Sequence, residues 1–501
     1  MGRPDLGGRH VSLREKTIRA FAWAGSAKAV TQAVSWAISI LLARLLVPSD
    51  FGLVAMAWTF VGLLEQINQL GIGAAIIQRA DMEEEDLQTL FWIALTAGIS
   101  FYAVAFLAAG PLAAFFGNDR LVEVIRLLAL TMVLSALSTV PFNLLTKDLA
   151  FGKRSKAEVL SVLAGGTVSI ALALQGYGVM SLIMGTLCQQ VMLTATVWVM
   201  AGWRPRWCFG PDRVGSAFRF GLSVMATRMI WYLHSSADTV IVGKLLGDRL
   251  LGFYSMSGQL STLPVQKIST IVNQVAFPVF SQLQHDLPKL RTYFLTITRF
   301  VALITFPLMI ALVVIAEPLV RLILTEKWLP VVDIFQIMCV IGVIKSVDTI
   351  IPNMLMARGR ADVLLKYNVA ILLVLPAAFF LGASYGLLGV AYAWVVAYPM
   401  LLLYLYRIGL AELGLSVTDY LKNLTPAILA AGAMGAGMAA FRLLDSALWG
   451  SNLWVSVVGA TLVGIMACAA ALALFQREMT AEVKGLVGSL RSPRPLAESP
   501  R

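Results

Sequence analysis

The chain has 501 residues, of which 58% are hydrophobic and only 13% are charged, and its mean hydropathy is +0.80. An ordinary soluble domain carries about a quarter charged residues, so this composition excludes a soluble enzyme and predicts an all-α integral membrane protein. The net charge is +11, but the basic residues are spread over many short polar segments. That spread favours basic loops near anionic lipid headgroups over nucleic-acid binding, so no nucleic-acid partner is expected.

Apolar stretches follow one another along almost the whole chain. A spanning helix needs about 20 mostly apolar residues, and this criterion predicts about fourteen of them. The predicted spans are 18–42, 51–77, 87–110, 121–145, 157–175, 179–202, 214–238, 250–280, 292–316, 331–356, 363–383, 385–407, 423–443 and 453–475. The first apolar stretch is far longer than that of a signal peptide and has no cleavage site after it, so we expect it to be retained.

Lysine and arginine concentrate in every second connection, starting from the N-terminus. Basic loops stay in the cytoplasm, so we expect both termini to be cytoplasmic. The segments 1–17 and 476–501 are then cytoplasmic tails, and residues 203–213 form a cytoplasmic connection.

An internal repeat relates the two halves of the chain. Ala43–Leu46, followed by Gly52, is matched about 200 residues later by Gly243–Leu246, followed by Gly252. Similar patterns recurring in the same order indicate a duplication.

Two further matches keep this order at slightly larger separations. Pro141–Asn143 is echoed by Ile351–Asn353 about 210 residues later, and Tyr177–Val179 by Tyr385–Leu387. We therefore predict two pseudo-symmetric six-helix lobes, followed by a peripheral C-terminal helix pair. The predicted bounds are 18–202 for the N-lobe, 214–407 for the C-lobe and 408–475 for the helix pair. An even number of crossings gives both copies the same orientation, as in many transporters.

Polar side chains at membrane depth are costly and by default mark a pathway or a binding site. Four predicted helices, two in each lobe, carry polar side chains, several of them at helical spacing, and we expect these helices to line one cavity. The candidate substrate-binding residues are Lys28, Gln32, Ser35, Glu65, Gln66, Arg228, Tyr232, Ser235, Gln266 and Lys267.

The predicted cavity carries a net positive charge. Lys28 and Arg228 occupy equivalent positions of the repeat, and with Lys267 they would repel one another unless an anion lay between them. Phosphate suits such a site, because lysine supplies a point charge and arginine a bidentate donor. Our hypothesis is that the cavity binds a pyrophosphate headgroup, while amides and hydroxyls meet a glycan. Alternatively, Lys28 extends to the interface or forms a structural ion pair with Glu65.

Acidic side chains are fewer within the predicted spans. Glu65 is the one carboxylate suspected of ion coupling, whereas Asp238 and Asp348 are expected to cap helix ends or to pair with Lys244 and Lys345. The four cysteines lie far apart and show no metal-ligand spacing, so the sequence indicates neither a disulfide framework nor a metal site. No cofactor and no catalytic residues are expected.

Several longer motifs resemble a known family. They are Leu42–Gly52, Ala237–Gly247, Gly252–Ser255, Leu263–Ile268 and Phe277–Ser281. Together they are similar to the polysaccharide-transporter branch of the multidrug/oligosaccharidyl-lipid/polysaccharide exporter superfamily, the Wzx-type flippases and especially the colanic-acid-exporter-like group. The resemblance covers nearly the whole chain.

This resemblance implies a fourteen-helix fold of two lobes and a transport activity without catalysis. The implied substrate is a polyprenyl-diphosphate-linked oligosaccharide, which crosses the bacterial cytoplasmic (inner) membrane for assembly of an exopolysaccharide, a capsule or a lipopolysaccharide. The implied partners are this lipid, the surrounding membrane lipids, and a polysaccharide polymerase and chain-length regulator. Alternating access of the two lobes to the cavity is the expected mechanism.

Other transport classes remain open at this point. A small-molecule or multidrug antiporter of the same superfamily would be expected to bind cations through intramembrane carboxylates, which basic residues outnumber here. A lipid-II flippase would differ only in the glycan carried. A membrane glycosyltransferase or polymerase would need catalytic residues in sizeable outer loops, whereas the predicted outer loops are short.

Overall fold

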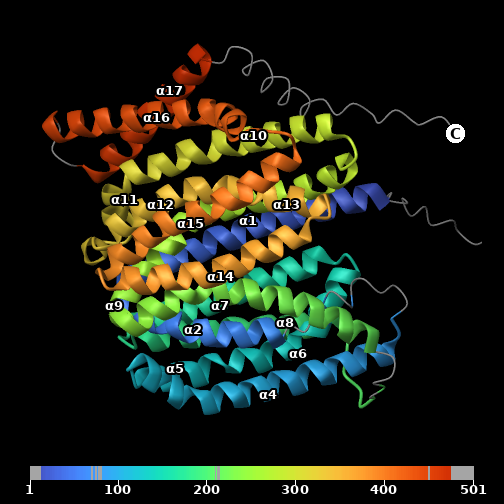
Figure 1. Ribbon diagram of the computed structural model, residues 1–501. Coiled ribbons are helices and arrows are strands. Elements are labelled where there is room, and N and C mark those ends of the chain that lie inside the picture. Colours follow the sequence, from blue (N-terminus) through green and yellow to red (C-terminus); the bar gives the residue numbers. More distant parts are fainter. Residues whose placement is uncertain are drawn as a thin grey trace, which may run out of the picture. The chain divides into compact units, whose positions relative to one another are not determined.

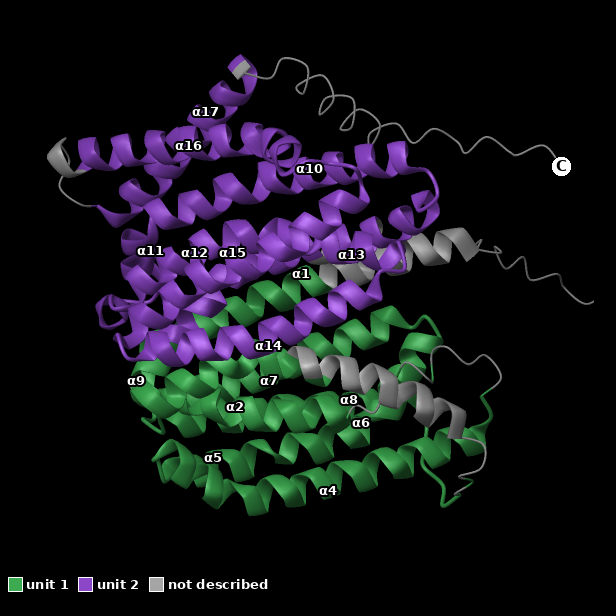
Figure 2. Cartoon of the chain, viewed as in Figure 1, with its two compact units in different colours: residues 1–252 green, residues 253–501 purple. Residues whose placement is uncertain are grey.

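The computed structural model describes residues 13–68, 72–73, 76, 82–208, 210, 215–448 and 452–475. Within these residues the secondary structure is helical, and no β-strand occurs. The chain divides into two compact units, Met1–Gly252 and Phe253–Arg501, coloured separately in Figure 2. The predicted tail 476–501 lies outside the described residues, and of the predicted tail 1–17 only residues 13–17 lie inside them.

The described part of the first unit contains seven complete helices and part of an eighth (Figure 1). The helices are α1 (Leu13–Leu45), α2 (Pro48–Asn68), α4 (Glu84–Phe116), α5 (Arg120–Leu128), α6 (Leu130–Lys147), α7 (Phe151–Leu174), α8 (Val179–Ala201) and the first part of α9 (Gly215–Leu283). Local chemistry sets some of their ends. A capping box of Glu83 and Asp86 starts α4, and Gly117 ends it in the left-handed conformation at φ 72°, which glycine adopts without a Cβ penalty.

The second unit contains the rest of α9 and the remaining helices. They are α10 (Leu287–Val314), α11 (Ala316–Ile323), the short 3₁₀ helix η2 (Glu326–Trp328), α12 (Val331–Asp348), α13 (Ile350–Ala357), α14 (Ala361–Ala383), α15 (Gly386–Glu412), α16 (Val417–Leu448) and α17 (Leu453–Phe475). The last two pack on each other, and α16 also packs on α10.

Helix α9 consists of two helices joined at a kink. It spans 69 residues, but Gly247 has φ 84° and ψ 176°, which is not helical. Glycine is the residue that adopts such a backbone at least cost. The kink falls between the predicted spans 214–238 and 250–280, so the two predicted helices are confirmed.

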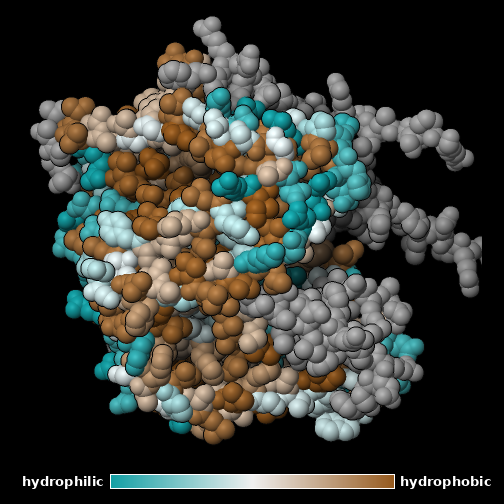
Figure 3. Space-filling view, in the orientation of Figure 1, coloured by the Kyte–Doolittle hydropathy of each residue, from teal (hydrophilic) through white to brown (hydrophobic). Residues whose placement is uncertain are grey.

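Eleven stretches in the described part of the chain are long and apolar enough to cross a membrane. Together with α1 and the two parts of α9, they make up the fourteen spans that the sequence predicts. Large apolar side chains face outward on many of them, for example Leu107, Leu373 and Leu462, which are 76%, 68% and 57% exposed. In Figure 3 hydrophobic side chains cover most of the face shown, and hydrophilic ones gather toward the helix ends. The protein is therefore a multi-pass helical membrane protein.

Helix packing repeats between the two units. In the first, α6 packs on α4 and on α8, and α7 packs on α8; in the second, α12 packs on α10 and on α15, and α14 packs on α15. These helices follow one another in the same order along the chain. The matching order and packing support the duplication that the sequence indicates.

Contacts between individual side chains are also repeated in the two halves of the chain. A Cβ added to Gly73 would lie 2.9 Å from Asn143 Oδ1, and at the equivalent place Asn353 Nδ2 donates a hydrogen bond of 2.9 Å to Asn273 Oδ1. The asparagines are 210 residues apart and their neighbours 200, as the sequence matches predict. The lobe bounds 18–202 and 214–407 stay a prediction.

Two glycines bring α2 and α9 into backbone contact within the first unit. A Cβ on Gly52 would overlap the carbonyl oxygen of Asp248, and a Cβ on Gly252 would overlap that of Pro48. Gly52 and Gly252 are equivalent residues of the repeat, and so are Pro48 and Asp248, so the crossing relates the two repeats symmetrically. Asn118 Nδ2 also donates to Asp248 Oδ2 at 3.1 Å. Small residues commonly allow such close helix crossings in membranes.

Hydrogen bonds attach the segment that follows α8, around residues 203–206, to the first part of α4. The indole Nε1 of Trp203 donates to Glu84 Oε1 at 2.7 Å, and Trp92 Nε1 donates to the carbonyl oxygen of Arg206 at 3.0 Å. These bonds hold much of the predicted connection 203–213 in place. Residues 209 and 211–213 of that connection lie outside the described part.

Candidate functional site

The predicted binding residues of α1 lie along a helix that packs on α7. Lys28 is exposed, whereas Gln32 and Ser35 are half-buried. Ile38 occupies the space left by Gly166 of α7, where a Cβ would overlap its side chain. Helix α1 is thus held in the first unit, and its lysine stays accessible.

The predicted carboxylate of α2 faces α6 in the interior of the first unit. Ser135 Oγ donates to Glu65 Oε1 at 2.8 Å. Asn68 Nδ2, one turn further along α2, donates to the carbonyl oxygen of Met132 at 3.2 Å. Gln66 is half-buried on the same helix. The polar stretch of α2 therefore also serves helix packing.

The predicted residues of the first part of α9 contact α2. Tyr232 Oη donates to the carbonyl oxygen of Trp58 at 2.7 Å, and its ring end fills the space beside Gly62, where a Cβ would overlap it. Ser235 Oγ donates to the carbonyl oxygen of Tyr232 at 3.1 Å. The side chain of Arg228 lies outside the described residues.

The structure brings part of the predicted set together. The described residues of α1, α2 and the first part of α9 belong to one unit, whereas Gln266 and Lys267 are exposed on α9 in the other. A single cavity lined by the whole set stays a prediction.

Sequence reasoning missed a buried polar cluster in the second unit. Tyr398 of α15 donates a short hydrogen bond to Asp348 Oδ2. The ammonium group of Lys345 lies 3.4 Å from the ring centroid of Trp394, and Trp394 Nε1 donates to Tyr254 Oη at 2.9 Å. The signal available in the sequence was a carboxylate in the interior of a predicted span, and a tyrosine inside another. It did not reveal that the two meet.

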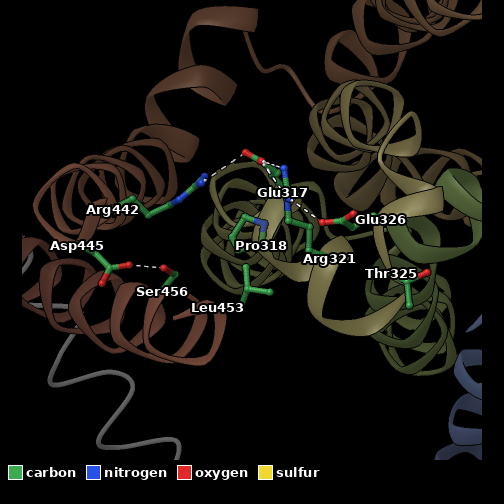
Figure 4. A pocket seen from close by; sticks show the side chains of 9 residues that line it. All are labelled: Glu317, Pro318, Arg321, Thr325, Glu326, Arg442, Asp445, Leu453 and Ser456. Atoms are coloured by element: carbon green, nitrogen blue, oxygen red, sulfur yellow. Dashed lines mark hydrogen bonds and ion pairs between the residues drawn. The ribbon is translucent and has the colours of Figure 1, made fainter. Parts of the chain in front are cut away.

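A second polar cluster surrounds a cavity of about 560 Å³ where α11, α16 and α17 meet (Figure 4). Arg321 Nη2 lies 3.1 Å from Glu317 Oε1, and Arg442 Nη2 lies 3.8 Å from Glu317 Oε2. On the other side, Ser456 of α17 donates a short hydrogen bond to Asp445 of α16. Because these groups partner one another, the cluster ties the C-terminal helix pair to α11.

A metal site needs several histidine, cysteine or carboxylate side chains close together. No group of three or more histidine, cysteine, aspartate or glutamate side chains in that part could hold a metal. The two polar clusters are built from ion pairs and hydroxyl groups instead.

Known proteins resemble this chain over most of its length. It is 29% identical over 418 residues to the lipopolysaccharide biosynthesis protein WzxC of Escherichia coli (strain K12), covering 83% of this chain and 85% of that protein. It is 26% identical over 388 residues to the succinoglycan biosynthesis transport protein ExoT of Rhizobium meliloti (strain 1021), covering 77% and 78%.

The fold is also similar to a solved structure, that of the lipid II flippase MurJ in an inward closed conformation. The TM-score is 0.71 at 13% sequence identity, and the match covers 91% of this chain and 99% of that one. The family model described as "Polysaccharide biosynthesis protein" matches residues 41–333. This match and the relatives confirm the resemblance to Wzx-type polysaccharide transporters. Because the family model spans more than half of the sequence, the chain belongs to the polysaccharide biosynthesis protein family.

Proposed function

We propose that this protein is a flippase that moves a polyprenyl-diphosphate-linked oligosaccharide across the bacterial inner membrane, for assembly of an exopolysaccharide, a capsule or a lipopolysaccharide. One observation carries the proposal: a member of a polysaccharide biosynthesis family consists almost entirely of membrane-spanning helices. Such a chain leaves little room for a catalytic domain, so transport rather than synthesis is its task. A relative that covers 77% of the chain is named as a transport protein.

The substrate explains why so many helices are needed. A diphosphate with several sugars would otherwise have to cross about 30 Å of hydrocarbon, which cannot solvate charge. Lys28 and Arg228 are the proposed ligands of the diphosphate, with Lys267 as a third cation. The side chains of Gln32 and Ser35, and of Tyr232 and Ser235 at the equivalent positions of the repeat, bind sugar hydroxyls. The lipid tail stays in the bilayer while the two lobes alternate in access.

Orientation follows from the basic loops. Both termini lie in the cytoplasm, so the ends of α14 and α15 that carry Ala361 and Glu412 face the cytoplasm as well. The glycan is delivered to the outer leaflet, where a polymerase and a chain-length regulator are the proposed partners. The covalent structure of the lipid and its glycan stays the same throughout this cycle.

The test is a flipping assay in proteoliposomes with a fluorescent polyprenyl diphosphate that carries an oligosaccharide. We expect Lys28→Ala and Arg228→Ala each to slow flipping by about tenfold or more, because a charge-assisted contact to the diphosphate is lost. Chemical reduction of the label in the outer leaflet measures the rate.

A matched control is Lys156→Ala, since Lys156 is an exposed cation near the start of α7 and is expected to leave the rate unchanged. Wild-type rates in both test variants would reduce the two cations to structural roles. Failure of the folded wild-type protein to flip any such lipid would refute the proposed activity.

A further inference from the structure

Asp348 is a carboxylate inside a membrane span, in the half nearer its C-terminal end. The span runs from Val331 to Ala357, and Asp348 lies nine residues before its end, which is about 13 Å at 1.5 Å per residue. It is also the last residue of α12, where the helix breaks before α13. A carboxylate at this depth is costly in ionised form unless it is fully hydrogen-bonded.

The hydrogen bonding of this cluster is incomplete. Tyr398 occupies Asp348 Oδ2, but Oδ1 is buried and accepts no hydrogen bond within the described part of the chain. The same is true there of Thr349 Oγ1, which is also buried, whereas the hydroxyl of Tyr367 interacts with that of Tyr398. Buried polar atoms are nearly always paired. Asp348 Oδ1 and Thr349 Oγ1 are two of several such unpaired side-chain atoms in the described part of the second unit, and they lie on adjacent residues, so Asp348 has a buried oxygen open to a proton.

Charged and titratable groups from four helices interact with Asp348 electrostatically or by a hydrogen bond. They are Lys345 of α12, Tyr367 of α14, Tyr398 and Tyr406 of α15, and Tyr420 of α16. One of them is a cation, and none is a second carboxylate. A metal cation would therefore meet a nearby ammonium group and a single anionic ligand, whereas a proton needs only one free oxygen.

Phenolic hydroxyls lie between this carboxylate and one end of the unit. Tyr420 Oη donates to Tyr406 Oη at 3.2 Å. Tyr420 lies in the first turn of α16, and Tyr406 lies in the last part of α15. In the orientation given above, this end of the unit is cytoplasmic. Tyr398 and Tyr406 lie eight residues apart on α15, about 12 Å along the helix axis, so Tyr398 and the Tyr406–Tyr420 pair are separate polar groups between Asp348 and the cytoplasmic end of the unit.

The duplicated fold does not need a carboxylate here. The repeat places Ser138 of α6 at the position of Asp348, 210 residues earlier, and Ser138 Oγ donates to the carbonyl oxygen of Ser135 at 2.9 Å. A small neutral side chain therefore occupies the equivalent position in α6, and no carboxylate is needed there. The acidic group distinguishes the second half of the protein from the first.

From this geometry we propose that Asp348 is a proton-binding site through which a transmembrane proton gradient drives transport. The proton adds to Oδ1, which forms one O–H bond and converts the carboxylate to a neutral carboxyl group; release reverses that step. Exchange with the cytoplasm takes place on the side where these phenols lie, and Lys345 is the neighbouring fixed charge. The role in transport rests on the proposed flippase function, whereas the proton site itself does not.

Infrared difference spectroscopy of the purified full-length protein tests the site without any transport. Wild type is expected to show a protonated-carboxyl band that disappears as pH rises, and Asp348→Asn is expected to lose this band.

Tyr398→Phe removes one hydroxyl and is expected to shift the pH midpoint at which the band disappears, which keeps the test valid if Asp348→Asn fails to fold. Asp445→Asn, which changes another buried carboxylate of the same unit, is expected to retain the Asp348 band. An unchanged band in a folded Asp348→Asn protein would overturn the proposal.

A transport experiment tests the coupling. The probe is a fluorescent polyprenyl diphosphate that carries one N-acetylglucosamine, flipped in proteoliposomes with or without an imposed pH gradient. We expect the gradient to change the wild-type rate by about fivefold or more, and Asp348→Asn to flip at one rate in both conditions. A rate that follows a sodium gradient instead of pH, or a pH response that survives in Asp348→Asn, would overturn the coupling role. Absence of flipping in all samples, with the infrared band intact, would refute the flippase function and the coupling role while leaving the proton site standing.

Discussion

The Gly252→Val variant is expected to unfold at much lower denaturant concentration than the wild-type protein. Its new side chain would overlap the backbone carbonyl of Pro48, and a backbone group cannot move aside by changing rotamer. Overpacking typically costs about 1–3 kcal/mol, and we expect a loss of free energy of unfolding at the upper end of that range or above. Chemical unfolding in detergent micelles, followed by tryptophan fluorescence, measures it.

Gly258→Val is the matched control for this prediction. Gly258 lies on the same helix six residues later, and a Cβ there would have no neighbour within 4 Å. The free energy of unfolding should therefore change by less than about 1 kcal/mol, because valine meets no neighbour there and is a better helix former than glycine. The double variant Gly52→Val/Gly252→Val is expected to lose less than the sum of the single losses, because both changes open one crossing. Equal stability of Gly252→Val and Gly258→Val would show that the backbone contact does not contribute.

Trp328→Ala is expected to destabilise the second unit by about 3–5 kcal/mol, the usual cost of truncating a buried aromatic side chain. The indole is completely buried, and its ring lies 6.0 Å from that of Phe253 in an edge-to-face arrangement at 84°. The side chain fills space between η2 and the second part of α9, and alanine would leave a large cavity there. The midpoint of thermal unfolding in detergent is the readout.

Trp454→Ala supplies the comparison within the same unit. Trp454 is 65% exposed near the start of α17, so its loss removes little buried area and should cost less than about 1 kcal/mol. If both variants unfolded at the same temperature as the wild-type protein, the buried indole of Trp328 would not contribute to the stability of the second unit.

The membrane architecture could be predicted from the sequence because hydropathy reports it directly. All fourteen predicted spans correspond to helices, and the break in α9 falls between two of them. The helices are longer than predicted at several ends. Helix α4 continues to Phe116 rather than residue 110, and α16 starts at Val417 rather than 423. Hydropathy marks only the hydrocarbon layer, whereas backbone hydrogen bonding carries these helices beyond it.

The polar interior could be predicted only in part. Periodicity correctly places Lys28, Gln32 and Ser35 along one helix, but it gives no information about which helix they face. The hydrogen bond between Tyr398 and Asp348 joins residues 50 positions apart in sequence. Such a contact depends on the rotation of two helices about their axes, which one sequence does not reveal. The same limit applies to Glu65, whose bond to Ser135 spans 70 positions.

The fastening of the segment after α8 bears on how the chain is made. In the described part of the chain its side-chain partners, Glu84 and Trp92 among them, precede it in the sequence, so these contacts do not depend on later synthesis. Domains generally fold from the N-terminus as the ribosome proceeds. The hydrogen bonds that attach this segment to α4 can therefore form while the second repeat is still being translated, so the first six helices need not wait for the rest of the chain to complete this part of their structure.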